Sequence, residues 1–155
     1  MSESMRVNMS LQVRQATPVD LPSVLALYAQ PAMDNGKVLT IAQAEQLLAQ
    51  FSHYPNYRLF VACKDDAVVG TFALLVMHNL AHQGTPSAIV EDVVVSEAHQ
   101  SQGIGRDMMH HAMALAREAG CYKLVLSSNQ KRERAHAFYE SLGFQRHGFS
   151  FSIEI

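Results

Sequence analysis

Apolar and polar residues recur along the first part of the chain with the spacing of strands and helices. Leu11 and Val13 alternate with polar residues, which predicts a short strand. Two helices should follow, because Thr17 and Thr40 each begin a helix-capping signal. Apolar residues at helical spacing give each helix one apolar face, formed by Leu21, Val24, Leu25 and Tyr28 and by Leu47, Leu48 and Phe51.

Three apolar stretches in the middle of the chain predict strands. Residues 57–63 and 67–77 flank a short charged turn, which is typical of an antiparallel hairpin. The polar segment 79–86 contains Gly84 and should be a loop. Residues 88–95 are almost continuously apolar, and this pattern predicts a central strand buried on both faces.

Helices and strands alternate again toward the C-terminus. The expected elements are a helix that begins near Ile104 and stops at Gly120, a strand over 122–126, a helix over 133–142, and a final hairpin of strands 144–145 and 149–153. The element order becomes β-α-α-β-β-β-α-β-α-β-β, with no internal repeat and no linker. This order predicts one mixed α/β domain over residues 1–155, with residues 1–9 as a loose start.

The composition excludes several classes of protein. Twelve Lys and Arg residues against fourteen Asp and Glu give a net charge of −2, whereas a dedicated nucleic-acid-binding protein has a strong basic excess. No segment has the pattern of a signal peptide or the about 18 consecutive apolar residues of a membrane helix. Cys63 and Cys121 lie in apolar stretches and provide no disulfide framework. We therefore expect a cytoplasmic protein that binds neither nucleic acid nor membrane.

The eight histidines do not have the spacing of a metal site. His110 and His111 are adjacent on a predicted helix, so their side chains point apart. His78 and His82 fall at a strand end and in a loop, outside any known metal-binding motif. The sequence therefore predicts no metal ion.

A glycine-containing loop connects the central strand to the helix that follows it. Its residues are Gln100, Ser101, Gln102, Gly103, Ile104 and Gly105. The free N–H groups at a helix N-terminus attract anions, so this loop predicts a phosphate or pyrophosphate site. A dinucleotide-binding motif would need a third glycine where the chain has Met108, and a Walker loop would need a terminal Gly-Lys-Ser/Thr.

A second motif follows downstream and contains Ala135, Phe138, Tyr139, Gly143 and Phe144. In this order, the two motifs resemble the GNAT superfamily of acyl-CoA-dependent N-acetyltransferases. Residues 100–105 match the Q/R-x-x-G-x-G/A pyrophosphate loop of that family, and residues 135–144 match its A-x-x-x-Y-x-x-x-G-F signature. The resemblance implies a central, mostly antiparallel sheet that is splayed at the cofactor site and flanked by about four helices.

The resemblance also implies that acetyl-CoA is the acetyl donor. By analogy, the pyrophosphate binds to residues 100–105 and Arg106, and the pantetheine arm binds to the strand backbone at Val93, Val94 and Val95. Many members carry Asn seven residues before the tyrosine, where this chain has Arg132, and Asn129 lies three residues earlier. Either of these residues, together with Phe138 and Tyr139, would complete the cofactor site.

The acetyl transfer needs a base for the amine and an acid for the departing thiolate. Tyr139 is the candidate acid, because its reference pKa of about 10 lies above the thiol value of about 8.5. Glu91 and Asp92 are the candidate bases, acting directly or through water. Strand alternation would send them to opposite faces, and Glu91 is favoured because it would share a face with Val93 and Val95.

Local matches extend to two subgroups. Residues 90–95 and 120–123 are similar to glucosamine-phosphate N-acetyltransferases, and residues 129–139 and 149–151 resemble aminoalkylphosphonate N-acetyltransferases. These matches favour a small-molecule primary amine as acceptor, phosphorylated amines included; acetylation of protein amines and a non-catalytic acyl-CoA-binding module are the alternatives. The acceptor should be shaped by loops 30–38 and 79–86 and by the second helix, with Asp34, Lys37 and Glu45 as the few charges. The apolar terminal strands and the resemblance together predict a homodimer.

Overall fold

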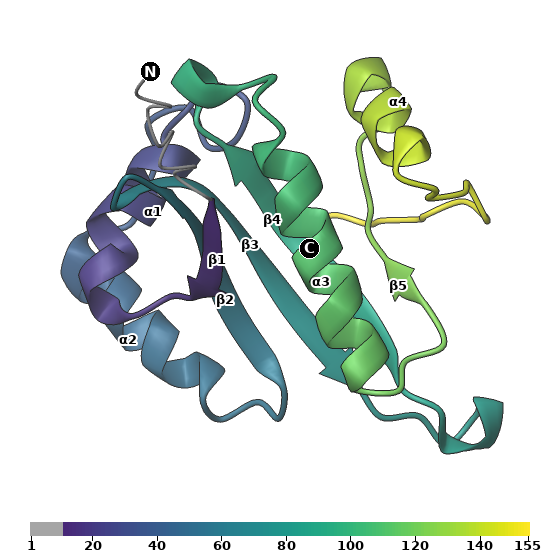
Figure 1. Cartoon of the computed structure of the whole chain (residues 1–155). Coiled ribbons are helices and arrows are strands. Elements are labelled where there is room, and N and C mark those ends of the chain that lie inside the picture. The colour runs from purple at the N-terminus through teal and green to yellow at the C-terminus, as the bar shows by residue number, and fades with distance from the viewer. Residues whose placement is uncertain (1–10) are drawn as a thin grey trace, which may run out of the picture. The chain divides into compact units, whose positions relative to one another are not determined.

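A computed structural model describes residues 11–155 (Figure 1). The chain divides into two units, Met1–Val125 and Leu126–Ile155, and each is described by itself. The first unit contains the sheet and three of the helices, and the second contains the last helix and the C-terminal segment. The expected loose start at residues 1–9 lies outside the described residues.

The sheet of the first unit has five strands in the order β1-β2-β3-β4-β5. These strands are β1 Gln12–Gln15, β2 Tyr57–Lys64, β3 Ala67–Met77, β4 Ser87–Val95 and β5 Leu124–Val125. The first four strands pair antiparallel, and β5 runs parallel to β4. The mixed, mostly antiparallel sheet predicted from the sequence is confirmed.

Each of the four predicted helices is present. They are α1 Leu21–Tyr28, α2 Ile41–Phe51, α3 Ile104–Glu118 and α4 Glu133–Ser141, with short 3-10 turns η1 Pro18–Asp20, η2 His82–Gly84 and η3 Glu97–His99. The capping box at the start of α2 forms as expected: Gln43 N–H donates to Thr40 Oγ1 at 3.2 Å, and Thr40 N–H donates to Gln43 Oε1 at 3.0 Å. Local capping signals thus set where the helices begin.

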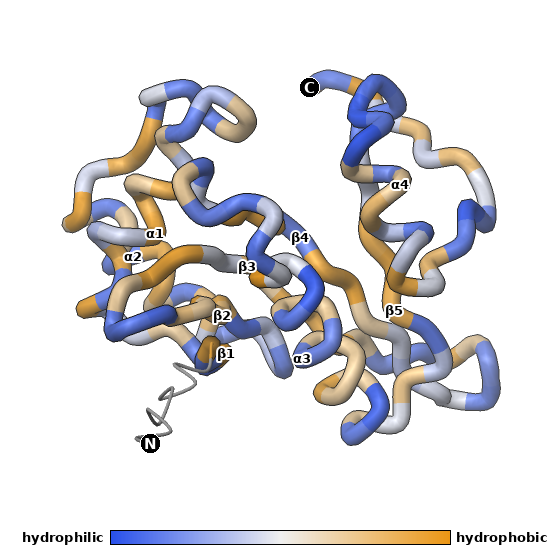
Figure 2. Tube along the Cα trace, turned by 45° about the horizontal axis from the view of Figure 1, so that its top comes forward, coloured by the Kyte–Doolittle hydropathy of each residue, from blue (hydrophilic) through white to orange (hydrophobic). Residues whose placement is uncertain are grey.

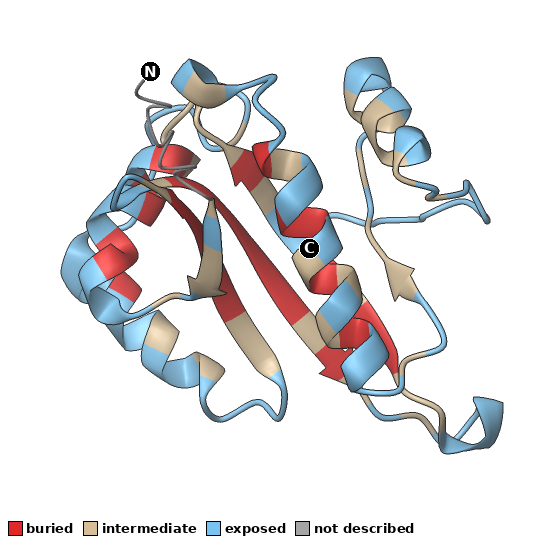
Figure 3. Cartoon of the chain, viewed as in Figure 1, coloured by how far each residue is buried: buried red, intermediate tan, exposed pale blue. Residues whose placement is uncertain are grey.

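The two faces of the sheet are covered by different helices. On one face, α1 and α2 pack over a cluster that includes Leu25, Leu59 and Val61. On the other face, α3 packs on β3 and β4 through buried Met108 and Met109. Figure 3 shows buried residues along the strands and on one side of these helices, and Figure 2 shows hydrophobic stretches along the same strands.

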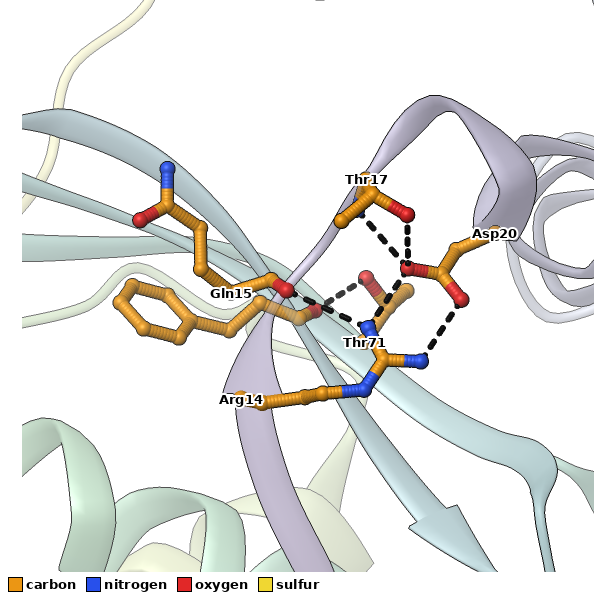
Figure 4. A network of polar contacts seen from close by, with 6 residues as sticks. Arg14, Gln15, Thr17, Asp20 and Thr71 are labelled. Carbon is orange, nitrogen blue, oxygen red and sulfur yellow. Dashed lines mark hydrogen bonds and ion pairs between the residues drawn. The ribbon is translucent and has the colours of Figure 1, made fainter.

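An ion pair links the first strand to the turn before α1 (Figure 4). The Arg14 guanidinium donates from Nη1 to Asp20 Oδ2 at 2.7 Å and from Nη2 to Oδ1 at 2.9 Å. The Thr17 N–H donates to the same carboxylate at 2.8 Å. Because of these hydrogen bonds, the pKa of Asp20 is lowered to about 2. This bidentate contact fixes the entry into α1.

The predicted C-terminal hairpin is wrong. Neither 144–145 nor 149–153 forms a strand, and the side chains of Phe149 and Phe151 are exposed. Alternation of apolar residues indicates side-chain direction, but a strand also needs a hydrogen-bonded neighbour, and no described strand pairs with this segment. The predicted strand over 122–126 is likewise reduced to the two residues of β5.

Candidate functional site

Strand β4 contains an irregularity at its middle. Val94 lies opposite Thr71 and Glu91 lies opposite Ala73, so Asp92 and Val93 together face the single residue Phe72. Asp92 has a φ of 53°, in the left-handed region. Two residues opposite one, with the first in this region, are a β-bulge, which bends the strand and re-aims its side chains.

The bulge overturns the alternation argument for Glu91. Ala73 belongs to the core cluster under α1 and α2, so its cross-strand partner Glu91 lies on that face of the sheet. Val95 pairs with Gly70, one position away from the Thr71 pair, and therefore lies on the opposite face. Glu91 does not share a face with Val95, because the extra residue inverts the alternation.

The second half of β4 has an open edge. Its pairing with β5 is limited to Ala88–Leu124 and Ile89–Val125, so none of the described strands pairs with residues 90–95 on that side. Ser96 N–H donates to the Val69 carbonyl of β3 at 2.8 Å. In an antiparallel strand, neighbouring N–H groups point to opposite sides, so the Val95 N–H points away from β3, toward the open edge. The side chain of Val94 is buried. The sheet is therefore splayed at this point, as predicted.

Gln30, which follows α1, holds the end of β4. Its Nε2 donates to the Val95 carbonyl at 3.2 Å, and its Oε1 accepts from the Glu97 N–H at 2.7 Å. The sequence predicts Gln30 only as the first residue of a loop. Nothing in the local pattern indicates this contact, because its partners lie more than 60 residues away along the chain.

The turn at residues 100–103 and the first helical residues 104–106, together called the α3 loop here, present backbone N–H groups. Gly103 precedes α3 with a φ of 80°, and a Cβ built there would meet no atom within 4 Å. The first N–H groups of an α-helix have no acceptor within the helix, and here these belong to Ile104, Gly105 and Arg106. Lys64 Nζ donates to Gln102 Oε1 at 2.9 Å and ties this loop to the end of β2. The arrangement fits a phosphate or pyrophosphate group.

The side chains of the α3 loop have two different settings. Gln100, Ser101, Gln102 and Arg106 are exposed, whereas Ile104 is buried in the core. The predicted contribution of Ile104 to an anion site can therefore come only from its backbone.

A pocket of about 500 Å³ lies between α1, α2, the loop that joins them, and the sheet. We call it the α1–α2 pocket. Its charged lining residues are Asp92 from β4 and Asp34 and Lys37 from the joining loop. The remaining lining residues are Leu21, Val24, Leu25, Tyr28, Val38, Leu39, Ala44, Leu47, Leu48, Phe51 and Leu59. Of the residues expected near the acceptor, Asp34, Lys37 and residues of the second helix line this pocket, whereas Glu45 and loop 79–86 do not, and neither does Glu91.

The ionisable groups around the pocket influence one another. Partial burial raises the pKa of the Asp92 carboxyl, and the charge of Asp34 adds to the effect. Burial also raises the pKa of Tyr28 to about 12, with Asp92 as the next cause. Both pKa values rise mainly because burial disfavours the charged form of each group, and the neighbouring negative charges add to the effect.

The second unit contains the remaining predicted site residues. Tyr139 lies on α4 between the rings of Phe138, at 5.2 Å, and Phe144, at 5.8 Å. Burial raises the pKa of Tyr139, and the charge of Arg132 partly opposes this. Asn129 Oδ1 accepts from the Lys131 N–H at 2.9 Å, and the Asn129 carbonyl accepts from the Arg132 N–H at 3.0 Å. Asn129 and Arg132 therefore belong to one turn that precedes α4.

Residues 11–155 lack two kinds of feature, a cluster of metal ligands and a membrane-spanning helix. No group of three or more His, Cys, Asp or Glu side chains in this part of the chain could hold a metal ion. None of its helices has the length and apolar character needed to cross a membrane.

Comparisons with known proteins agree with this geometry. The acetyltransferase (GNAT) family model matches residues 24–144. A glucosamine 6-phosphate N-acetyltransferase of Trypanosoma brucei brucei is 28% identical over 88% of this chain and 90% of its own length. An aminoalkylphosphonate N-acetyltransferase of Salmonella typhimurium LT2 is 30% identical over 91% of this chain and 89% of its own length. A solved structure from Agrobacterium tumefaciens C58, assigned to the acetyltransferases, has a TM-score of 0.87 at 35% identity and covers 93% of this chain and 99% of its own. The chain therefore belongs to the GNAT family of acetyltransferases.

Proposed function

We propose that the protein transfers an acetyl group from acetyl-CoA to the primary amine of a small molecule. One observation carries the proposal: the bulged, open-edged part of β4 runs from the carboxylate in the α1–α2 pocket toward the α3 loop. A single strand thus borders a candidate amine site and leads into a candidate anion site. Two of the relatives named above, the glucosamine 6-phosphate and the aminoalkylphosphonate N-acetyltransferases, support this class of reaction.

The residues present fit acetyl-CoA. The N–H groups of the α3 loop would hold its pyrophosphate, and the N–H groups of Val93 and Val95 would bond its pantetheine arm. Asn129 or Arg132, with Phe138, remain proposed cofactor-binding residues on the strength of the sequence motif. When bound, acetyl-CoA supplies the acetyl group as a reactive thioester.

Asp92 is the residue that we propose as the base. A primary amine with a pKa near the lysine value of about 10.4 is mostly protonated at neutral pH, so a proton must leave before attack. Asp92 lines the α1–α2 pocket, and its raised pKa makes it a better proton acceptor than an exposed aspartate. Glu91 lies on the same face of the sheet outside the lining residues and is the second candidate.

Tyr139 is the residue that we propose as the acid. Its pKa is raised by burial, so the hydroxyl keeps its proton at neutral pH. The proton is therefore in place when the thiolate of CoA leaves; its transfer is uphill, because the reference pKa of a thiol is only about 8.5, and the tyrosinate then regains a proton from water.

We further propose that the protein acts in the cytoplasm as a homodimer. The two cysteines are free thiols, which suits a reducing compartment. The apolar C-terminal residues suit pairing between subunits.

An assay of CoA release from acetyl-CoA tests the function. We expect release that depends on a small primary amine and exceeds release with lysine-containing peptides. Preference for peptides would point instead to acetylation of protein amines. Tight acetyl-CoA binding in calorimetry with no release for any amine would show a binding module and would contradict the proposal.

A further inference from the structure

We infer that the acceptor is a cationic amine with an apolar body, and that amines carrying a phosphoryl or phosphonyl group are poor acceptors for this chain. The inference rests on the proposed function and concerns the same α1–α2 pocket. Its basis is the nature of the groups that line this pocket: eleven apolar or aromatic side chains, two carboxylates and one ammonium.

Several of the apolar lining residues remain exposed. The exposed fractions are 38% for Val38, 41% for Leu39 and 50% for Leu47, although all three lie at one pocket. Exposed apolar side chains that gather around a concave site mark a binding surface for an apolar group. Buried Leu25 and Leu59 form part of its wall, so an apolar body that enters is surrounded by carbon.

The charges of the pocket favour a cation. Asp34 lies close enough to Asp92 for its negative charge to raise the pKa of the Asp92 carboxyl. Among the described residues, Lys37 is the single positively charged residue that lines the pocket. An ammonium group would relieve the repulsion between the carboxylates. A doubly charged phosphoryl group would meet two carboxylates and one ammonium, and this arrangement disfavours it.

Two other cations of the first unit have different partners, and Arg58 lies on the opposite face of the sheet, because it alternates with Leu59 of the cluster under α1 and α2. Arg14 forms its ion pair with Asp20 at 2.7 Å. The Arg58 guanidinium lies over the Phe60 ring at 5.2 Å from the centroid. Neither of these arginines lines the pocket. Lys37 is therefore the charge on which a phosphorylated acceptor would have to rely within this unit.

A series of unbranched alkylamines tests the apolar part of the inference. Each buried methylene contributes about 0.8 kcal/mol, so kcat/KM should rise about fourfold per methylene from propylamine to heptylamine. Glucosamine 6-phosphate and 2-aminoethylphosphonate should be weaker acceptors than heptylamine. If the phosphorylated amines react best, or if chain length has no effect, the inference is wrong while the proposed acetyl transfer stands. If no amine of either kind releases CoA, the proposed function itself fails.

A pair of variants on one helix places the effect at the pocket. Leu47 lines it and is 50% exposed, whereas Ile41, also on α2, is 48% exposed and does not line it. Leu47→Ser should lower kcat/KM about tenfold for heptylamine and much less for propylamine. Ile41→Ser should leave kcat/KM unchanged for both amines. Calorimetry of heptylamine binding without acetyl-CoA should show the same loss of affinity in Leu47→Ser. Equal effects of the two variants, or unchanged heptylamine affinity in Leu47→Ser, would overturn the inference.

Discussion

At the scale of single residues, the conformation of Asp92 links the fold to the chemistry. A φ of 53° is unusual for a residue other than glycine, although aspartate adopts it more readily than most. Such a conformation costs on the order of 1–3 kcal/mol and persists where the surrounding structure enforces it. Here the β3–β4 pairing on both sides of the bulge enforces it, and the carboxylate lies at the α1–α2 pocket.

Replacement of the two neighbouring carboxylates one at a time should identify the base. Asp92→Asn should lower kcat/KM at neutral pH by about 10²-fold, because a proton acceptor is lost, and activity should recover as rising pH deprotonates the amine. Glu91→Gln makes the same change one residue away and serves as the control. The measurement is a pH profile of CoA release. A large loss in Glu91→Gln with little change in Asp92→Asn would reverse the assignment.

The hydroxyl of Tyr139 can be removed without its ring. Tyr139→Phe keeps the packing against Phe138 and Phe144 and deletes the proton donor. We expect kcat to fall by about 10²-fold, with acetyl-CoA affinity almost unchanged. Steady-state kinetics and calorimetry measure these two quantities. An unchanged kcat would mean that water or another group protonates the thiolate.

The Arg14–Asp20 ion pair should make stability depend on acid. The pKa of Asp20 is about 2 in the folded chain and about 3.9 when unfolded, a difference that corresponds to about 2–3 kcal/mol. Because the folded pKa is the lower one, this stability is present above about pH 4 and is lost as the pH falls toward 2. Denaturant unfolding at several pH values should show this slope in the parent and a reduced slope in Asp20→Asn. Equal slopes would show that the pair contributes little.

The residues of the site differ in how far the sequence reveals them. The α3 loop and Tyr139 lie in continuous motifs, so their chemistry can be read from neighbouring residues. The bulge at Asp92 cannot be read in this way, because it depends on the register between β3 and β4. Regular alternation favours Glu91 over Asp92, and the register between β3 and β4 removes that argument.

At the scale of elements, local signals predicted better than long-range ones. The starts of α1, α2 and α3 follow from capping residues and a glycine loop, which act within a few residues. The C-terminal hairpin was predicted from apolar alternation alone and does not form. The extent of β5 depends on how much of β4 it can pair with, and this pairing ends after two residue pairs.

The N-terminus of α3 offers a test of the anion site. Gly105→Glu places a bulky negative group among the N–H donors of the α3 loop, so acetyl-CoA affinity should fall by more than tenfold through clash and repulsion. Gly148→Glu adds the same charge where nothing lies within 4 Å of the new Cβ, and it should leave affinity unchanged. Calorimetry with acetyl-CoA measures both. Parental affinity in Gly105→Glu would show that the loop does not bind the cofactor.

At the scale of the whole molecule, the C-terminal segment exposes a row of large apolar residues. The exposed fractions are 84% for Phe149, 92% for Phe151 and 84% for Ile153. They alternate with polar residues, so an extended backbone would carry them on one side. Soluble proteins rarely leave such a row in contact with water, and edge pairing with a second copy would cover it.

We therefore predict a homodimer held together by this segment. A symmetric pair of copies is the commonest way to cover a self-complementary apolar surface, and pairing of two segments would supply the strand partner that each lacks in the isolated chain. Light scattering or sedimentation at micromolar concentration should give twice the chain mass of 17.2 kDa. Phe151→Ser should shift this equilibrium toward the monomer, whereas Leu80→Ser, which changes an equally exposed residue in loop 79–86, should not. A parent chain that stays monomeric at micromolar concentration would contradict the dimer, and no residue of a second copy could then contribute to the acceptor site.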